Sequence, residues 1–276
     1  MTDRDLEIFS YLERFGAGSL GQIWAGFFKR VDRDTVPWLF LDKPAVARGV
    51  FTRVYKRLTK LVACGYLDRI QWVYPRHTLY RLTGKGHWQL VRKGLSAFAK
   101  PMEAWPKEGE FNHTLLLAAV ALVLNRCLGR SIESEREIIR DYWKRSRKSG
   151  RYGQMRLADM VIKPIDDSGA SIKVELELTL KNNSRYFDYW DYLGSDLRGV
   201  KAHILYIAGS PAIKDHILWL AKKKEARGLY ACDLQAFKES LGNCHFVNMN
   251  GGVSLVSRFD PRAGKEKEVA RATGGN

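Results

Sequence analysis

Residues 174–181 read Val-Glu-Leu-Glu-Leu-Thr-Leu-Lys, and this strict alternation of apolar and polar residues constrains the fold more than any other part of the chain. Alternation with a period of two predicts a β-strand, because successive side chains on a strand point to opposite faces. The even-numbered residues would form an apolar face directed at a core. Glu175, Glu177, Thr179 and Lys181 would share the other face.

Two carboxylates and an ammonium group on one strand face suit a divalent cation and a phosphodiester. Asp159 lies sixteen residues before Glu175, at the end of the motif Arg-Leu-Ala-Asp. An acid followed by a Glu-x-Glu strand and a lysine resembles the metal site of PD-(D/E)xK nucleases, although Glu177 stands where that pattern commonly has lysine. Asp159, Glu175 and Glu177 would then bind Mg²⁺ or Mn²⁺, which prefer carboxylate oxygens.

Lys181 fits this pattern only if the strand is not continuous. At about 3.3 Å per residue, an ideal strand separates Lys181 from Glu175 by roughly 20 Å. The lysine can join a site at Glu175 only if the strand bends or ends before it. A half-buried strand with a solvated face is the alternative for the two glutamates, although acids are depleted in strands and repel one another there.

The charge of the chain favours a polyanionic partner. The formal net charge is +16, and the first 100 residues hold 18 Lys and Arg against 8 Asp and Glu. The N-terminus is polar, and the longest apolar run, 114–124, is shorter than the roughly 20 residues that span a bilayer. The four scattered cysteines are expected to be reduced core thiols. We therefore expect a cytoplasmic protein without a membrane segment that binds double-stranded DNA.

Residues 1–97 have the pattern of a winged helix-turn-helix domain. Thr2 and Ser19 would cap two helices, and a third helix would run from about Pro44 to Ala63. Two strands, 66–73 and 77–82, and a further helix would follow. A basic third helix fits the major groove, although a solvated basic face is the alternative. The candidate DNA-contacting residues here are Arg48, Arg53, Lys56, Arg57, Lys60 and Arg76.

The rest of the chain has the pattern of an α/β domain (α+β for the chain as a whole). Residues 98–110 read as a linker, 111–259 as a restriction-endonuclease-like PD-(D/E)xK core and 260–276 as a disordered tail. The elements expected in the core are helices at 111–127 and 131–143, strands at 157–162 and 172–181, a helix at 185–193, a strand at 202–208, a helix at 213–224 and a strand near 245–249.

Several other residues are candidates with plain structural alternatives. Glu135 would assist a metal site or only belong to a capping box in Ser-Glu-Arg-Glu. His113 would be functional or an exposed residue in the first turn of a helix. Arg185 would contact phosphate. The three tyrosines of one aromatic helix would supply a nucleophile for covalent strand transfer, but packing is their expected role; they are Tyr186, Tyr189 and Tyr192.

Together these motifs resemble the replication-relaxation family, which includes the MOBC-class plasmid mobilisation relaxases. The resemblance covers about residues 2–210. It rests on the order of Thr2-Asp-Arg-Asp-Leu, Phe111-Asn-His113, Ile132-Glu-Ser-Glu135-Arg-Glu, Arg156-Leu-Ala-Asp159 and the strand ending in Lys181. One departure is Ala158, where the family often has proline.

The resemblance implies a metal-dependent enzyme that nicks one DNA strand at a plasmid transfer origin. Asp159, Glu175, Glu177 and Lys181 would form its active site, with Glu135 as a helper. An accessory mobilisation protein is left open as a partner. Two other functions fit the same residues: a non-catalytic replication or transcription regulator with a degenerate nuclease core, and an endonuclease that cuts both strands and therefore needs two active sites.

Overall fold

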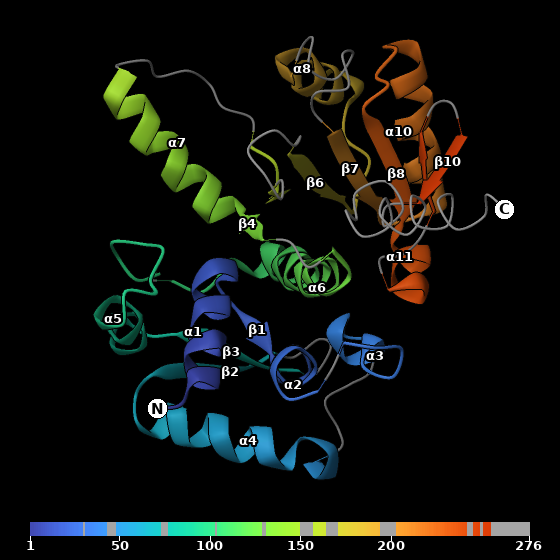
Figure 1. Ribbon diagram of the computed structural model, residues 1–276. Coiled ribbons are helices and arrows are strands. Elements are labelled where there is room, and N and C mark those ends of the chain that lie inside the picture. The colour runs from blue at the N-terminus through green and yellow to red at the C-terminus, as the bar shows by residue number, and fades with distance from the viewer. Residues whose placement is uncertain are drawn as a thin grey trace, which may run out of the picture. The chain divides into compact units, whose positions relative to one another are not determined.

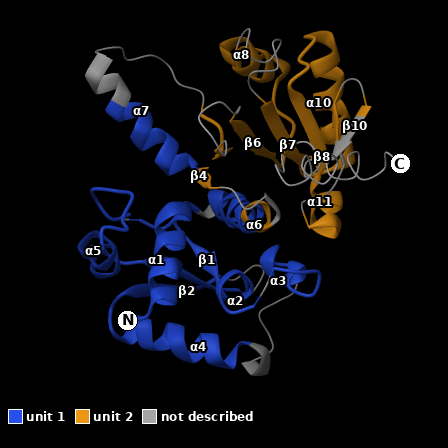
Figure 2. Cartoon of the chain, in the orientation of Figure 1, with its two compact units in different colours: residues 1–122, 134–152 blue, residues 123–133, 153–276 orange. Residues whose placement is uncertain are grey.

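In the computed structural model the chain is a mixed α/β protein (Figure 1). The structure describes residues 1–29, 31–42, 48–72, 77–102, 104–128, 131–149, 157–163, 171–193, 203–241, 245–248 and 251–254. The chain divides into two compact units, the first with residues 1–122 and 134–152 and the second with residues 123–133 and 153–276 (Figure 2). Each unit has its own sheet.

The first unit combines helices with a small antiparallel sheet of strand order β1-β3-β2. Its elements are α1 (Asp3–Phe15), β1 (Gly18–Ser19), α2 (Leu20–Phe27), α3 (Val36–Leu39), α4 (Arg48–Ala63), β2 (Leu67–Trp72), β3 (His77–Leu82), α5 (Gly84–Arg92), η1 (Glu108–Glu110), most of α6 (Phe111–Leu128) and α7 (Glu135–Ser149). The predicted helices and hairpin are confirmed. Helix α3 is not among the helices that the sequence predicts, and the predicted start of the third helix at Pro44 lies outside the described residues.

The first two helices begin at the capping residues that the sequence predicts. The Thr2 hydroxyl accepts a hydrogen bond from the Asp5 N–H, and the Asp5 carboxylate accepts one from the Thr2 N–H. Ser19 and Gln22 form the same reciprocal pair at the start of α2. Gly16 ends α1 with φ of 82°, a conformation that costs glycine little.

A buried carboxylate holds three segments of the first unit together. Glu13, on α1, is 3% exposed and accepts hydrogen bonds at 2.7 Å from the Ser96 hydroxyl and at 3.2 Å from the Ala97 N–H. Its Oε1 also lies 2.7 Å from Nδ1 of the fully buried His87 on α5. Each carboxylate oxygen therefore has a polar partner, as burial of a charged group requires.

Helix α7 and the first part of α6 belong to the first unit, whereas we expected the second domain to begin at Phe111. Gln22 Nε2 donates to the Leu115 carbonyl at 2.6 Å, and Arg14 Nε pairs with Glu137 at 2.8 Å. These contacts join residues far apart in sequence, so local patterns could not place the boundary.

The expected linker at residues 98–110 also packs against the first unit where it is described. The Arg81 guanidinium lies 5.1 Å from the centre of the Trp105 ring, and that ring lies 6.3 Å from the Phe111 ring. Met102 contacts Gly16 so closely that a Cβ there would meet its Cε at 2.9 Å. The segment thus covers apolar surface of the unit it follows.

The second unit is built on a mixed sheet with strand order β10-β9-β8-β7-β6-β5-β4 in the described part of the chain. Its elements are β4 (Ile132–Ser134), β5 (Met160–Ile162), β6 (Ile172–Glu177), α8 (Asn183–Leu193), β7 (His203–Ala208), α10 (Pro211–Lys223), β8 (Leu229–Asp233), α11 (Leu234–Ser240), β9 (His245–Asn248) and β10 (Gly251–Ser254). Strands β6, β7 and β8 are parallel and lie side by side in Figure 1, while β5 and β9 run antiparallel to their neighbours.

One face of the parallel strands is covered by helices α8 and α10. Their buried side chains form a cluster with alternate residues of β7 and β8, among them Trp190, Ile204, Ile217 and Leu229. Helix α10 starts at Ser210, whose hydroxyl accepts from the Ile213 N–H. This covered face is the one on which the candidate site lies.

The sequence predicted β5, β6, α8, β7, α10 and β9, the first two with longer bounds, and missed four elements of the second unit. Those missed are β4, β8, α11 and β10. Strand β4 is three residues long inside a charged stretch that we read as helix, and β8 is a short apolar run without alternation. The expected tail at 260–276 lies outside the described residues.

Two other expectations meet the structure directly. No helix among the described residues is both long and apolar enough to cross a lipid bilayer. Cys232 is buried, as expected of a core thiol, but Cys64 is exposed because it lies at the end of α4, just before the turn at Gly65.

Replacing Gln22 with alanine should lower the free energy of unfolding by about 3 kcal/mol, since it leaves the buried Leu39 and Leu115 carbonyls without this donor. Urea unfolding followed by circular dichroism measures the change. The matched control Gln71→Ala removes an exposed side chain and should stay within about 0.5 kcal/mol of the wild type. Equal stability of the two variants would contradict the role assigned to Gln22.

Candidate functional site

The two glutamates of the central motif lie side by side on β6 and are both buried. Glu175 is 8% exposed and Glu177 is 2% exposed. The parallel register pairs them with Tyr206 and Ala208 of β7, so they face the side of the sheet that α8 and α10 cover. The alternative of a solvated acidic face is therefore excluded, because β6 is an interior strand with helices packed on its polar face.

Strand β6 ends at Glu177, not at Lys181 as the alternation predicted. The Glu177 carbonyl accepts the last ladder hydrogen bond from the Gly209 N–H at 2.8 Å. A Cβ on Gly209 would lie 3.1 Å from Cα of Leu178, so the glycine permits this close approach of the backbones. Leu180, assigned to the apolar face, is 55% exposed as a result.

Because β6 ends at Glu177, the chain that follows it can turn and bring Lys181 close to the glutamates. Lys181 Nζ lies 2.8 Å from Glu177 Oε2, which forms an ion pair across four residues of non-strand chain. The backbone N–H of Lys181 donates to the Tyr186 hydroxyl at 3.3 Å, which fixes the turn into α8. The distance that an ideal strand would impose between Lys181 and the acids therefore does not apply.

Asp159 lies next to both glutamates through the backbone of β6. Its Oδ2 accepts a hydrogen bond of 2.7 Å from the N–H of Leu176, the residue between them. We expected Asp159 inside a strand from 157 to 162. Strand β5 begins only at Met160, so Asp159 is the residue just before it. The described pairing of β5 with β6 reaches only as far as Met160 and Val174. Beyond it, the Asp159 carboxylate, not a backbone carbonyl, accepts the hydrogen bond from the Leu176 N–H.

A pocket of about 340 Å³ opens over these side chains. It is formed by the end of β6, the following turn, the first turns of α8 and one residue of β7. Its lining residues are Leu157, Glu175, Glu177, Lys181, Arg185, Tyr186, Tyr189 and Tyr206. The structure therefore brings four of the predicted residues, namely Glu175, Glu177, Lys181 and Arg185, to one cavity.

Burial disfavours the charged forms of both glutamates. The pKa of Glu175 is raised well above its usual value, first by burial and then by the neighbouring Asp159 carboxylate. The pKa of Glu177 is raised by burial, an effect that Lys181 opposes. Oε1 of Glu175 is buried without a hydrogen-bond partner among the described residues. The described residues therefore leave one carboxylate oxygen of this pair of acids without a hydrogen bond or an ion pair.

The tyrosines of the pocket are packing residues whose hydroxyls reach the acids. Tyr186 and Tyr189 are buried in the α8 core, and burial raises the pKa of Tyr186 to about 12. Tyr206 is also buried, and its hydroxyl accepts from the Trp190 indole N–H at 3.1 Å. A phenol with a raised pKa is a poor nucleophile near neutral pH. Tyr192 is 55% exposed and does not line the pocket, so packing does not describe it.

The donor set suits a divalent cation only in part. The two glutamates offer hard carboxylate oxygens, one of them without a partner, and a bound cation would favour the charged forms that burial and then neighbouring acids disfavour. Asp159, however, is already bonded to the β6 backbone. Among the described residues, no three His, Cys, Asp or Glu side chains stand close enough together to hold one ion.

Three predicted site residues are not among those that line this pocket: Asp159, which bonds to the backbone of β6, and Glu135 and His113. Glu135 is the exposed first residue of α7, and His113 lies in the first turn of α6, both in the first unit. The capping interaction expected near Glu135 is present in part, since Glu137 Oε2 accepts from the Ser134 N–H at 2.8 Å. Neither Glu135 nor His113 lines the pocket at Glu175.

The candidate DNA-contacting residues on α4 divide by exposure. Arg53, Lys56 and Lys60 are exposed. Arg57 is not a free cation, because its guanidinium pairs with the buried Asp5 carboxylate. The side chain of Arg48 and all of Arg76 lie outside the described residues.

Sequence reasoning gave no pocket role to Tyr206 or Leu157 and only a packing role to Tyr189. The one sequence signal for Tyr206 is its position as the only hydroxyl-bearing residue in the apolar run of β7. Its place beside Glu175 depends on the parallel register of β6 and β7, which no local pattern encodes.

Comparison of the chain with models of protein families, with curated proteins and with solved structures gave no match.

Replacing Glu175 with glutamine should raise the free energy of unfolding at pH 8 in the presence of EDTA. An acid whose pKa is raised on folding binds its proton more tightly in the folded state. The penalty is therefore absent below the ordinary value of 4.5, grows as pH rises and is complete above the folded-state pKa. If the pKa of Glu175 is one unit higher in the folded than in the unfolded state, the free energy of unfolding at high pH is lower by about 1.4 kcal/mol.

Urea unfolding between pH 4 and pH 8 tests this sign. The gain from Glu175→Gln should shrink toward zero at pH 4, while Glu239→Gln, at an exposed residue, should stay within about 0.5 kcal/mol of the wild type throughout. If Glu175→Gln is less stable than the wild type at pH 8, the ionised Glu175 carboxylate does not destabilise the folded state and the prediction is contradicted.

Proposed function

We propose that the protein is a metal-dependent DNA endonuclease that cuts one strand of a duplex. The observation that carries the proposal is the pocket in which two buried glutamates of raised pKa stand beside Lys181 and Arg185. Paired carboxylates with adjacent cations are the arrangement needed to bind a divalent ion and a phosphodiester together. Few structural roles account for two buried acids on one interior strand, one of which keeps an oxygen without a hydrogen-bond partner among the described residues.

The residues of this chain have separate roles in the proposed reaction. Glu175 and Glu177, with Asp159 beside them, would hold Mg²⁺ or Mn²⁺. When bound, such an ion supplies charge neutralisation at the scissile phosphate and a water of lowered pKa. Lys181 is held at Glu177 by its ion pair and is placed to stabilise charge that develops on the phosphate. Arg185 is exposed at the rim and would bind a flanking phosphate.

The architecture supports a PD-(D/E)xK core as the finer description of the second unit. A short strand, β5, precedes the acidic strand β6, helix α8 follows, and β7 then pairs parallel with β6. The acids lie at the end of β6, which leads into α8. We assign the fold on this order and on the position of the acids within it.

A winged helix-turn-helix is the finer description that we propose for the start of the first unit. Helices α1, α2 and α4 are followed by the β2–β3 hairpin, with β1 completing the small sheet. The exposed cations of α4 are then suited to duplex DNA, with Lys and Arg neutralising phosphates. The excess of basic residues in the first 100 positions is consistent with this role.

The resemblance to MOBC-class relaxases narrows the proposed substrate to a plasmid transfer origin. In that case the first unit would bind the origin and the second would nick one strand. The resemblance rests on motif order alone, so the site and strand that are cut have to be found by experiment.

A non-catalytic DNA-binding regulator is the second candidate. It is favoured by one observation, namely that no three acidic, His or Cys side chains converge on a common ion position among the described residues. A degenerate nuclease core would keep the buried glutamates and lose the third ligand. This candidate predicts specific DNA binding without cleavage.

Supercoiled plasmid that carries the cognate origin should be converted to open circles in Mg²⁺ or Mn²⁺ and not in EDTA. The variants Glu175→Gln and Asp159→Asn should each slow nicking by roughly 100-fold or more. Asparagine keeps an oxygen that can accept the Leu176 hydrogen bond, so the second variant removes charge with little change of structure. Agarose gel electrophoresis separates the products.

The matched control for this assay is Glu239→Gln, which should nick at the wild-type rate. DNA binding by both active-site variants should equal that of the wild type. Metal-dependent nicking that persists in Glu175→Gln would remove this pocket as the active site. Tight binding of the origin by the wild type without nicking would favour the regulator.

The double variant Lys56→Gln/Lys60→Gln should bind duplex DNA roughly tenfold more weakly or worse at 0.15 M salt, because it removes two exposed cations of α4. Fluorescence anisotropy with a labelled duplex measures the change. The control Lys222→Gln removes an exposed cation of the second unit and should leave affinity unchanged. Equal affinity of all three proteins would exclude α4 from the DNA interface.

A further inference from the structure

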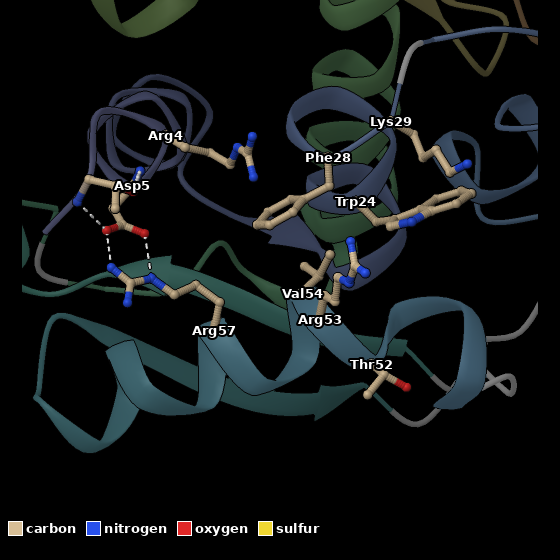
Figure 3. A pocket seen from close by; sticks show the side chains of 10 residues that line it. Arg4, Asp5, Trp24, Phe28, Lys29, Thr52, Arg53, Val54 and Arg57 are labelled. Atoms are coloured by element: carbon tan, nitrogen blue, oxygen red, sulfur yellow. Dashed lines mark hydrogen bonds and ion pairs between the residues drawn. The ribbon is translucent and has the colours of Figure 1, made fainter.

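A second and larger pocket lies within the first unit, between the start of α1, the end of α2 and α4 (Figure 3). Its volume is about 810 Å³. It is lined by Thr2, Arg4, Asp5, Trp24, Phe28, Lys29, Thr52, Arg53, Val54 and Arg57. The four cations among them come from three different segments, so the pocket collects charge that no single helix carries.

Three of the four cations of this pocket are not balanced by acids in the part of the chain that the structure describes. Arg4, Lys29 and Arg53 form no ion pair with the described residues. Asp5 is the one acid among the lining residues, and Arg57 already neutralises it. In Figure 3 the Arg53 side chain extends from α4 toward Phe28 and Trp24, and Arg4 reaches over from α1. The pocket therefore carries a net positive charge of three and suits an anion.

The aromatic rings of the pocket are not free to stack on a nucleobase. The Arg4 guanidinium lies 4.7 Å from the centre of the Phe28 ring and so covers one of its faces. Trp24 is 8% exposed and packs edge-to-face against Phe51 at 5.1 Å. Base stacking needs an open ring face. The ligand that fits best is therefore a phosphoryl group, not a base.

The ion pair of Asp5 and Arg57 positions the wall of this pocket. Asp5 is 1% exposed and caps α1, and its Oδ1 accepts from Arg57 Nε at 2.8 Å. Burial by itself raises the pKa of Asp5, but the hydrogen bonds from Arg57 and Thr2 outweigh it, so the pKa is lowered. The pair fixes α1 on α4, so Arg4 and Arg53 are held across one cavity.

We propose that this pocket binds a phosphate of the DNA backbone, next to the stretch of duplex that α4 would contact. The inference rests on the proposed DNA binding of the first unit and adds Arg4 and Lys29, which lie outside α4, to the interface. Contacts with phosphate carry no base information. The pocket therefore raises affinity for every sequence equally, and discrimination between sequences is left to other residues.

The test measures duplex binding as a function of salt for Arg4→Gln, Lys29→Gln and Arg53→Gln. Each variant should bind roughly fivefold more weakly at 0.15 M salt, and the slope of log K against log salt should fall by about 0.9 for each phosphate that the variant no longer neutralises. The loss of affinity should be the same for the origin and for an unrelated duplex. Lys93→Gln, an exposed cation at the end of α5, is the matched control and should leave the slope unchanged.

The outcomes separate this inference from the function on which it rests. Wild-type protein that binds no duplex even at low salt would remove both. Wild-type binding with unchanged slopes in all three pocket variants would overturn the pocket and leave DNA binding by α4 intact. Calorimetric titration with inorganic pyrophosphate covers the other source of phosphate: tight binding that the variants abolish, with DNA binding unaffected, would assign the pocket to a free phosphorylated ligand and overturn its role in DNA binding.

Discussion

The burial of ionisable acids is the constraint on which both units depend, and the two units meet it differently. In the first unit Glu13 receives hydrogen bonds from Ser96 and Ala97, and Asp5 is paired with Arg57. In the second unit Glu175 keeps an oxygen without a hydrogen-bond partner in the described structure. A buried charge that its own protein does not satisfy is costly, so its retention points to a ligand that satisfies it.

The same contrast separates acids with a structural role from the acids of the candidate site. Asp5 and Glu13 each connect helices that are distant in sequence. Both oxygens of each carboxylate have a polar partner. Glu177 forms an ion pair with Lys181, which comes from a turn at the mouth of a cavity and not from a packed helix. Burial raises the pKa of both Glu175 and Glu177, while Asp5 has a lowered pKa because Arg57 and Thr2 outweigh its burial. Opposite shifts in similar surroundings therefore follow from the partners, not from burial alone.

Local patterns in the sequence predicted most helices and four of the residues that line the candidate pocket, but not the geometry that brings them together. The caps at Thr2 and Ser19 are short-range hydrogen bonds and could be read from spacing. The alternation at residues 174–181 predicted a strand that was four residues too long, because the pairing with β7 ends at Gly209 and lies outside any local pattern. Parallel pairing also decides that Tyr206 stands beside Glu175, and long-range contacts such as Gln22 with Leu115 decide where the first unit ends.

The distribution of charge bears on how the two units would share the proposed function. At the second-unit pocket Lys181 is already paired with Glu177, so this pocket attracts a polyanion less than the pocket of the first unit. In the first unit Arg4, Lys29 and Arg53 have no ion pair with the described residues, and Lys56 and Lys60 are also exposed on α4. In the proposed function, electrostatic capture of DNA would therefore fall to the first unit. The second unit, once DNA is held by the same chain, needs only enough affinity to position one phosphate, because its effective concentration is set by the tether.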